Sequence, residues 1–184
     1  MKAGKLVIRI TGGVLKGRTI PVPQGIIRPA MDRMRESVFA VLGDLNGASF
    51  LDLFSGSGII ILEAASRGAC YLEAVESDPL KWKTLIANTA LSASSIHCRL
   101  MAVELFIKRS RRTFNYIFCD PPFNYKFKAE LLNTIGSSKL MNNISLLIIH
   151  RPKKEILSFG MQAILSLKET RVYGNSAVDF YKKI

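Results

Sequence analysis

A strand, a glycine-rich turn and a helix follow one another near residue 50, and this succession restricts the fold more than any other feature of the sequence. The apolar run 49–54 predicts a strand, a Gly-Ser-Gly turn follows at 56–58, and the apolar run 59–67 predicts a helix. Glycines at such a turn let the backbone approach a ligand closely. The unit therefore indicates an α/β domain with a nucleotide-binding edge.

An acidic residue ends the next predicted strand, 71–75. This residue, Glu76, lies about twenty residues beyond the turn, where a carboxylate can bind both hydroxyls of an adenosine ribose. A tight turn without a ligand and a solvated strand end are the alternative interpretations. Dinucleotide-binding domains share the pattern, but their fingerprint has a third glycine where this chain has Ile61. S-adenosylmethionine fits better, and its predicted contacts are Asp52, Phe54, Ser55, Gly56, Ser57, Gly58, Glu76 and Ser77.

The tetrapeptide Asp-Pro-Pro-Phe at 120–123 follows another apolar strand, 115–119, and ligands bind at the carboxyl ends of strands in open α/β sheets. A carboxylate there can accept hydrogen bonds from an exocyclic amino group, the prolines leave carbonyls as acceptors, and the ring can stack on a base. A strand-ending turn with a buried ring is the alternative. The predicted catalytic residues are Asp120, Pro121, Pro122 and Phe123, which would hold an amine toward the sulfonium.

The formal net charge of +12 indicates a polyanionic partner. Basic residues concentrate in the first 45 residues, where predicted strands 6–10 and 18–22 and a helix 32–42 form an extension that could clamp RNA. The predicted RNA contacts are Lys16, Arg18, Arg28, Arg33 and Arg35. A second basic run, 108–112, is open to two interpretations, a solvated loop or a nucleic-acid contact.

Composition narrows the class of protein further. A chain of 184 residues with 48% apolar residues fits one domain with a full core. Its apolar runs are too short to span a membrane and its start lacks the apolar core of a signal peptide, so we expect a cytoplasmic protein.

Three separate cysteines indicate reduced core thiols, and we expect no metal. His97 and His150 are isolated, and neither is assigned a role.

Helices and strands alternate through the rest of the chain. Predicted helices cover 80–91, 103–108 and 127–137, predicted strands cover 96–100 and 145–149, and segments 164–173 and 177–181 form a terminal antiparallel hairpin. The pattern predicts a doubly wound, mostly parallel sheet. We expect a single domain, 1–184, made of a basic extension, 1–45, and a Rossmann-like core, 46–184.

These motifs resemble the RsmD family of 16S ribosomal RNA guanine-N2 methyltransferases. The similar segments are 10–13, 16–18, 21–23, 28–29, 32–39, 51–58, 63–69, 76–78, 120–123 and 173–181, which together span nearly the whole chain. Many amino methyltransferases share the glycine turn and Asp-Pro-Pro-Phe. The N-terminal segments are much more specific, and they decide between the subfamilies.

The resemblance implies a class I methyltransferase fold with a seven-stranded sheet, S-adenosylmethionine as donor and one guanine of small-subunit ribosomal RNA as acceptor. Methyl transfer would be direct and in line, with Asp120 and the Pro121 carbonyl aligning the N2 amine and Phe123 stacking on the unstacked base. Arg28, Arg33 and Arg35 would hold phosphates. The substrate would be an assembling small subunit and the enzyme a monomer. Adenine recognition between Ala102 and Glu104 departs from the usual pattern and is left unassigned.

Two other functions are compatible with parts of the sequence. A DNA adenine-N6 or other amino methyltransferase would share the glycine turn and the Asp-Pro-Pro-Phe motif. A non-catalytic RNA-binding ribosome assembly factor would need only the basic surface, and the two chemical motifs disfavour it.

Overall fold

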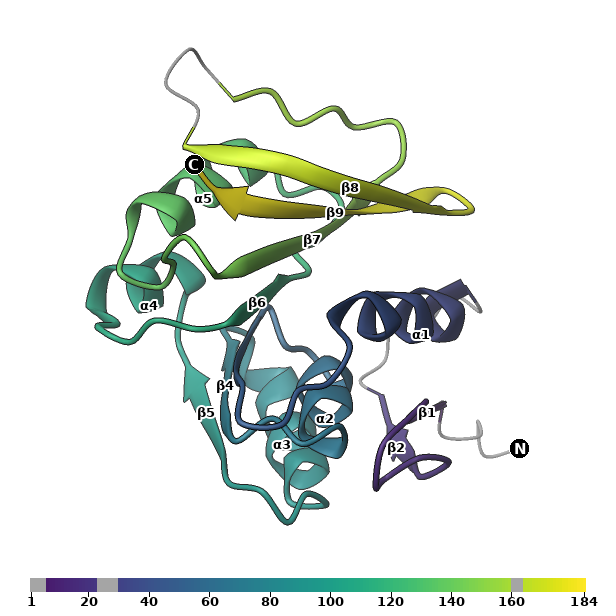
Figure 1. Ribbon diagram of the computed structural model, residues 1–184. Helices are drawn as coiled ribbons and strands as arrows, with labels where there is room; N and C mark the ends of the chain where they lie inside the picture. The colour runs from purple at the N-terminus through teal and green to yellow at the C-terminus, as the bar shows by residue number, and fades with distance from the viewer. Residues whose placement is uncertain (1–5, 23–29, 160–163) are drawn as a thin grey trace.

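A seven-stranded sheet forms the centre of the computed structural model, which describes residues 6–22, 30–159 and 164–184 (Figure 1). The strands lie in the order β5-β4-β3-β6-β7-β9-β8. Five of them are parallel, and β9 runs antiparallel to both β7 and β8. The bounds are β3 Ser49–Leu53, β4 Tyr71–Glu76, β5 Ile96–Leu100, β6 Tyr116–Cys119, β7 Leu146–Pro152, β8 Leu165–Tyr173 and β9 Ser176–Lys183. The predicted fold class, with its antiparallel C-terminal hairpin, is confirmed.

Helices cover both faces of this sheet, so its central strands are apolar on both sides. Phe50 packs in the core cluster of α1, α2 and α3, whereas Leu51 and Leu53 pack in the cluster of α4 and α5. This alternation follows from the period of two in a strand. The helices are α1 Ala30–Leu42, α2 Ile59–Ser66, α3 Pro79–Thr89, α4 Val103–Arg109 and α5 Lys128–Ser137. In the described part of the chain, no helix has the length and apolar character needed to cross a membrane.

The chain order places a crevice between β3 and β6. From β3, the chain adds β4 and β5 on one side and then returns to add β6 and β7 on the other. The connections that leave the carboxyl ends of β3 and β6 therefore diverge, and such a point is where open α/β sheets bind ligands. Phe54 and Asp120 directly follow these two strands, and the Asp120 N–H donates to the Leu53 carbonyl at 3.2 Å.

The N-terminal extension packs on α2. Its strands β1 (Val7–Arg9) and β2 (Thr19–Pro21) form an antiparallel hairpin, as predicted. The tip of this hairpin is fixed to α2, because the Val14 N–H donates to the Ser66 carbonyl at 2.8 Å. Ile10 and Ile20 are fully buried in the same core cluster as α2. The extension and the α2 side of the sheet thus share one core.

The structure contradicts one of the predicted RNA contacts, that of Arg35. Its side chain is 0% exposed, and its Nε donates to Glu63 Oε1 at 3.1 Å. Its Nη2 donates to Asp32 and to the Arg9 carbonyl, both at 2.7 Å. A guanidinium that is enclosed and paired in this way has no surface for a phosphate. Arg35 instead joins α1, α2 and β1, so its predicted role in RNA binding is wrong.

Candidate active site

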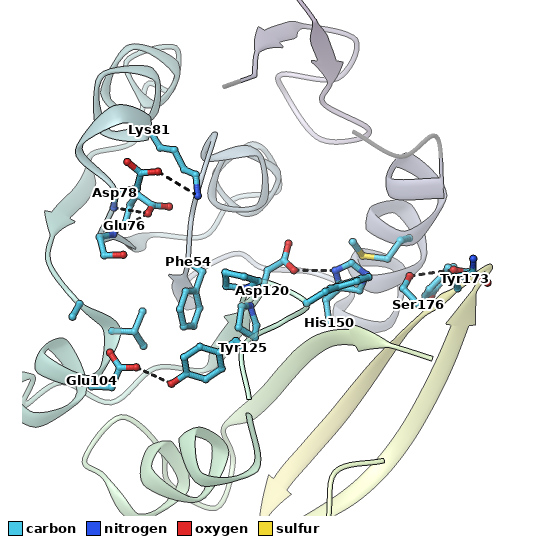
Figure 2. A pocket seen from close by; sticks show the side chains of 18 of the residues that line it. Phe54, Glu76, Asp78, Lys81, Glu104, Asp120, Tyr125, His150, Tyr173 and Ser176 are labelled. Atoms are coloured by element: carbon cyan, nitrogen blue, oxygen red, sulfur yellow. Dashed lines mark hydrogen bonds and ion pairs between the residues drawn. The ribbon is translucent and has the colours of Figure 1, made fainter. Parts of the chain in front are cut away.

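A cavity of about 980 Å³ opens at the carboxyl ends of the parallel strands. One half is formed by Phe54 after β3, the end of β4, the start of α3 and the start of α4. The other half is formed by the Asp-Pro-Pro-Phe turn, β7, the β8–β9 turn and Met34 of α1. Figure 2 shows side chains from these separate segments converging on the cavity. Its size lies at the upper end of ordinary small-molecule sites, so it can hold a nucleoside cofactor together with part of a base.

Glu76 lies in the first half of the cavity, at the end of β4. Its carboxylate accepts backbone hydrogen bonds from Gly56 at 2.8 Å, Ser77 at 2.9 Å and Asp78 at 2.8 Å. These bonds tie the glycine turn after β3 to the end of β4. The predicted pairing of the glycine turn with an acidic strand end is therefore present as a direct contact. Glu76 and Ser77 both line the cavity, as does Phe54.

The glycine turn has the backbone that its sequence requires. Gly56 and Gly58 have φ of 54° and 78°, in the left-handed region. A Cβ on Gly58 would lie 2.8 Å from Leu85 Cδ1, so α3 packs against the turn at this point. The cavity lining does not include Ser55, Gly56, Ser57 or Gly58, and these residues support its wall. Their predicted contact with a cofactor stays a prediction.

Asp52 lies beneath the turn and is only 1% exposed. Burial, followed by the charge of Asp120, raises the pKa of its carboxyl well above the ordinary value of 3.8. Within the described part of the chain its Oδ2 has no hydrogen-bond partner. The predicted direct contact between Asp52 and a cofactor is therefore wrong for this structure, because the side chain is enclosed by the sheet and the turn.

All four residues of the Asp-Pro-Pro-Phe motif line the second half of the cavity. Asp120 keeps 28% of its side chain exposed, and its Oδ1 lies 2.9 Å from His150 Nδ1. The Phe123 ring packs edge-on against His150, with 5.2 Å between ring centroids. Figure 2 shows Asp120 and His150 facing each other across the floor of the site. His150 comes from β7, and no pattern in the sequence indicated a role for it.

Lys128 binds the backbone of the Asp-Pro-Pro-Phe turn. The sequence did not predict this role. Its side chain is buried, and its Nζ donates to the carbonyls of Phe123 at 3.0 Å and Tyr125 at 2.6 Å. Glu155 pairs with the same ammonium at 2.9 Å. A charged donor that binds two carbonyls of one turn restricts its backbone. Lys128 therefore fixes the shape of the turn that carries Asp120 and Phe123.

Tyr125 separates the two halves of the cavity. Its ring packs edge-on against Phe54 at 5.8 Å, and its hydroxyl donates to Glu104 at 2.7 Å (Figure 2). Burial and the Glu104 hydrogen bond both raise the pKa of Tyr125, so its hydroxyl keeps the proton that it donates. Ala102 and Val103 line the cavity beside Glu104. The segment that the sequence left unassigned is therefore part of the site.

The rim opposite Glu76 is formed by the turn between β8 and β9. Residues 173–176 line the cavity there together with Met34 of α1. The Tyr173 hydroxyl donates to Ser37 Oγ at 2.6 Å, which joins this turn to α1. The C-terminal segment belongs to the family resemblance, but no local pattern indicated that it would reach the active site.

The remaining predicted RNA contacts differ in their positions. Lys16 and Arg18 are exposed on the N-terminal hairpin, and Arg33 is exposed on α1. Arg28 lies outside the described residues.

No group of three potential metal ligands occurs in residues 6–22, 30–159 and 164–184.

The sheet order, the Glu76 site and the Asp-Pro-Pro-Phe turn together define a class I methyltransferase. The model of a family described as Conserved hypothetical protein 95 matches residues 8–182, and the chain belongs to this family. It is 32% identical to Ribosomal RNA small subunit methyltransferase D of Escherichia coli strain K12, over 98% of this chain and 92% of that protein. The resemblance to the RsmD family is confirmed.

Solved structures agree with this assignment. "Putative methyltransferase yhhF" from Escherichia coli superposes with a TM-score of 0.84 at 33% identity, covering 96% of this chain and 98% of that one. A hypothetical protein of Thermus thermophilus superposes with a TM-score of 0.81 at 29% identity, covering 97% and 100%. Both cover this chain almost completely, so the N-terminal extension is included in the shared fold.

Proposed function

We propose that this enzyme transfers a methyl group from S-adenosylmethionine to the exocyclic N2 amine of one guanine in small-subunit ribosomal RNA. The observation that carries the proposal is the placement of Glu76 and Asp120 in one cavity, on either side of the point where the strand order reverses. The name of the Escherichia coli relative supports the choice of ribosomal RNA.

The first half of the cavity fits the donor by its chemistry. Glu76 offers carboxylate oxygens to the two ribose hydroxyls, and Phe54, Ala102 and Val103 offer apolar surface to an adenine. Asp120 places negative charge where the positive sulfonium would lie. When bound, S-adenosylmethionine supplies an electrophilic methyl group for direct transfer to a nucleophile.

The second half of the cavity fits an amine. Guanine N2 is a weak nucleophile, because its lone pair is delocalised into the ring, so alignment and charge stabilisation must supply most of the rate. Asp120 accepts one hydrogen of the amine. The Pro122 carbonyl already accepts from the Tyr125 N–H at 2.8 Å, so we assign the second hydrogen to the Pro121 carbonyl. The lone pair then points along the donor's methyl axis.

His150 keeps Asp120 in this orientation. A carboxylate has no hydrogen to donate, so the 2.9 Å contact requires that His150 Nδ1 carries the proton. With Oδ1 held by His150, Oδ2 is the oxygen that remains for the amine. Asp120 can then accept the proton that the amine loses after methyl transfer. His150 is thus a positioning residue, whereas Asp120 touches the reacting group.

The target base must leave its stack to enter the cavity, as base-modifying enzymes require. Phe123, which lines the cavity, would stack on it, and the β8–β9 turn would form the opposite wall. Lys16, Arg18 and Arg33 would contact the RNA phosphates near the N-terminal hairpin. We place the reaction on an assembling small subunit and assign the active form as a monomer.

Labelled S-adenosylmethionine tests this proposal against the alternatives. The wild-type protein is incubated separately with small ribosomal subunits that lack the modification, with the same RNA freed of protein, and with duplex DNA. We expect label in RNA, most strongly in subunits, and none in DNA. Asp120→Ala should abolish incorporation while the affinity for RNA stays within about twofold, because phosphate contacts dominate affinity. Label in duplex DNA, or wild-type turnover by Asp120→Ala, would overturn the proposal.

A further inference from the structure

Four cations at the end of α4 have no part in the proposed active site. Lys108 and Arg109 lie in the last turn of α4, Arg111 and Arg112 lie in the loop that follows, and all four are exposed. None of the four forms an ion pair with any residue that the structure describes. Carboxylates do pair with Arg35, Arg67, Arg99, Arg151 and Arg171. The chain therefore concentrates uncompensated charge in one short segment.

A hollow of about 690 Å³ lies beside this segment, between α4 and the edge strand β5. Four guanidinium groups line it, those of Arg99, Arg109, Arg111 and Arg112. Within the described chain Glu73 is the one carboxylate of its lining, which leaves three positive charges uncompensated. A concave, strongly cationic surface of this kind attracts a polyanion and repels other cations.

Three of the four guanidinium groups are held in place by contacts within the protein. Arg112 lies over the Tyr71 ring, with its Cζ 3.8 Å from the ring centroid, and Tyr71 itself packs against His97 and Phe114. Arg111 Nη1 donates to the Lys108 carbonyl at 3.1 Å, and Arg99 Nε donates to Glu73 at 2.8 Å. Stacking uses the face of a guanidinium and leaves its edge N–H groups as donors.

We infer that this hollow is a second binding surface for the phosphate backbone of the substrate RNA. The inference rests on the proposed function for the identity of the polyanion. Arginines present paired N–H donors that match phosphate oxygens, and several fixed arginines suit a backbone with regularly spaced charges. A bilayer surface would favour an amphipathic helix with an exposed apolar face instead of a concave site lined by guanidinium groups.

The position of the hollow indicates the path that bound RNA must take over the protein surface. Met101 lines the hollow and the next residue, Ala102, lines the active-site cavity, so the two sites lie side by side. The N-terminal hairpin lies on the opposite side of the sheet, with α1 and α2 (Figure 1). RNA that contacts both cationic surfaces must pass around the molecule. A folded RNA domain can do this, whereas a short single strand bound at the target base cannot.

The test is RNA affinity measured as a function of salt. The triple variant Arg109→Gln, Arg111→Gln, Arg112→Gln is compared with a matched triple variant on another surface, Lys153→Gln, Lys154→Gln, Lys168→Gln. The probe is small-subunit ribosomal RNA freed of protein. Each lost phosphate contact reduces the slope of log affinity against log salt by about 0.7–0.9. We expect the arginine variant to reduce the slope by about 2 to 3, and the lysine variant to leave it unchanged.

A second variant separates binding from stability. Arg109→Gln alone removes one exposed charge of the hollow and leaves the Arg112 stacking and the Arg111 hydrogen bonds intact, and it should reduce the slope by about 0.7–0.9. In methylation assays the KM for small subunits should rise about tenfold in the triple variant, with kcat and cofactor affinity unchanged.

An unchanged salt slope in both arginine variants would overturn this inference, even if RNA is methylated normally. Loss of binding to phosphatidylglycerol vesicles with unchanged RNA binding would overturn it in favour of a membrane contact. Failure of the wild-type protein to methylate RNA would instead count against the proposed function, because the binding measurement does not depend on turnover.

Discussion

His150 Nδ1 and Asp120 Oδ1 are 2.9 Å apart, although 30 residues separate them in the chain. The two residues come from β7 and from the end of β6, which are neighbouring parallel strands. This contact fixes one oxygen of the carboxylate that we assign to the target amine. The orientation of Asp120 therefore depends on a side chain of the next strand.

The amide of asparagine can replace the Nδ1 donor of His150, and leucine cannot. We expect His150→Leu to lower kcat about 10- to 100-fold, which corresponds to the loss of one hydrogen bond to a charged group. His150→Asn should remain within about threefold of the wild type, since its amide nitrogen can lie near the Nδ1 position. Cofactor affinity, measured by calorimetry, should be unchanged in both variants. Equal loss of kcat in both would contradict a positioning role and favour a role for the imidazole as an acid or base.

Glu76→Gln tests the cofactor half of the cavity. The amide loses charge and one acceptor, so we expect the dissociation constant of S-adenosylmethionine to rise about tenfold, equivalent to one hydrogen bond. Turnover at saturating cofactor should change little. Glu73→Gln is the matched control, because Glu73 lies on the same strand but contacts Arg99 outside the cavity. Unchanged cofactor affinity in Glu76→Gln would exclude the assigned ribose contact.

Arg35 and Arg33 lie on the same helix and should respond in opposite ways. Arg35→Met leaves the buried Glu63 without one of its partners, and we expect a loss of roughly 3–5 kcal/mol in the free energy of unfolding, measured with urea. Arg33→Gln changes an exposed residue, so its stability should stay within about 0.5 kcal/mol of the wild type while RNA affinity falls. A stable Arg35→Met protein with weakened RNA binding would restore the original assignment of Arg35.

Asp52 predicts an unusual dependence of stability on pH. Because burial raises the folded-state pKa of its carboxyl above the unfolded value near 3.8, the unfolded state releases this proton first as pH rises. The contribution of Asp52 to stability is therefore greatest at low pH and decreases as pH rises from about 3.8 through the folded pKa. Asp52→Asn removes this contribution. We expect the stability of the variant relative to the wild type to increase as pH rises above about 3.8, measured by urea unfolding. A difference that does not depend on pH would contradict the raised pKa.

The sequence predicted the elements whose signals are local. Periods of two and of about 3.6 residues located the strands and helices, and the glycine turn required positive φ at Gly56 and Gly58. Glu76 and Asp120 could be predicted to share a site, because the carboxyl ends of parallel strands meet at one edge of a sheet. These predictions needed only the order of elements along the chain.

The residues that were missed depend on contacts between distant segments. A single histidine within a strand has no pattern that names its partner, so His150 could not be connected with Asp120. In the sequence Lys128 cannot be distinguished from a surface lysine. Only the folded chain brings its Nζ to the carbonyls of the turn at 123–125. Arg35 did carry a signal: it lies three and four residues before Val38 and Phe39, on the buried face of α1. Its position on the helix predicts burial, whereas its charge alone predicts exposure.

Identification of the methylated nucleoside tests whether the enzyme modifies the guanine N2 amine. Small ribosomal subunits from cells that lack the enzyme are incubated with labelled S-adenosylmethionine and the protein, and the RNA is digested to nucleosides and separated. We expect the label to appear as N2-methylguanosine, and we expect none with Asp120→Ala. Label in N6-methyladenosine or in any other nucleoside would contradict the assignment of the Asp120 and Phe123 pocket to the guanine amine.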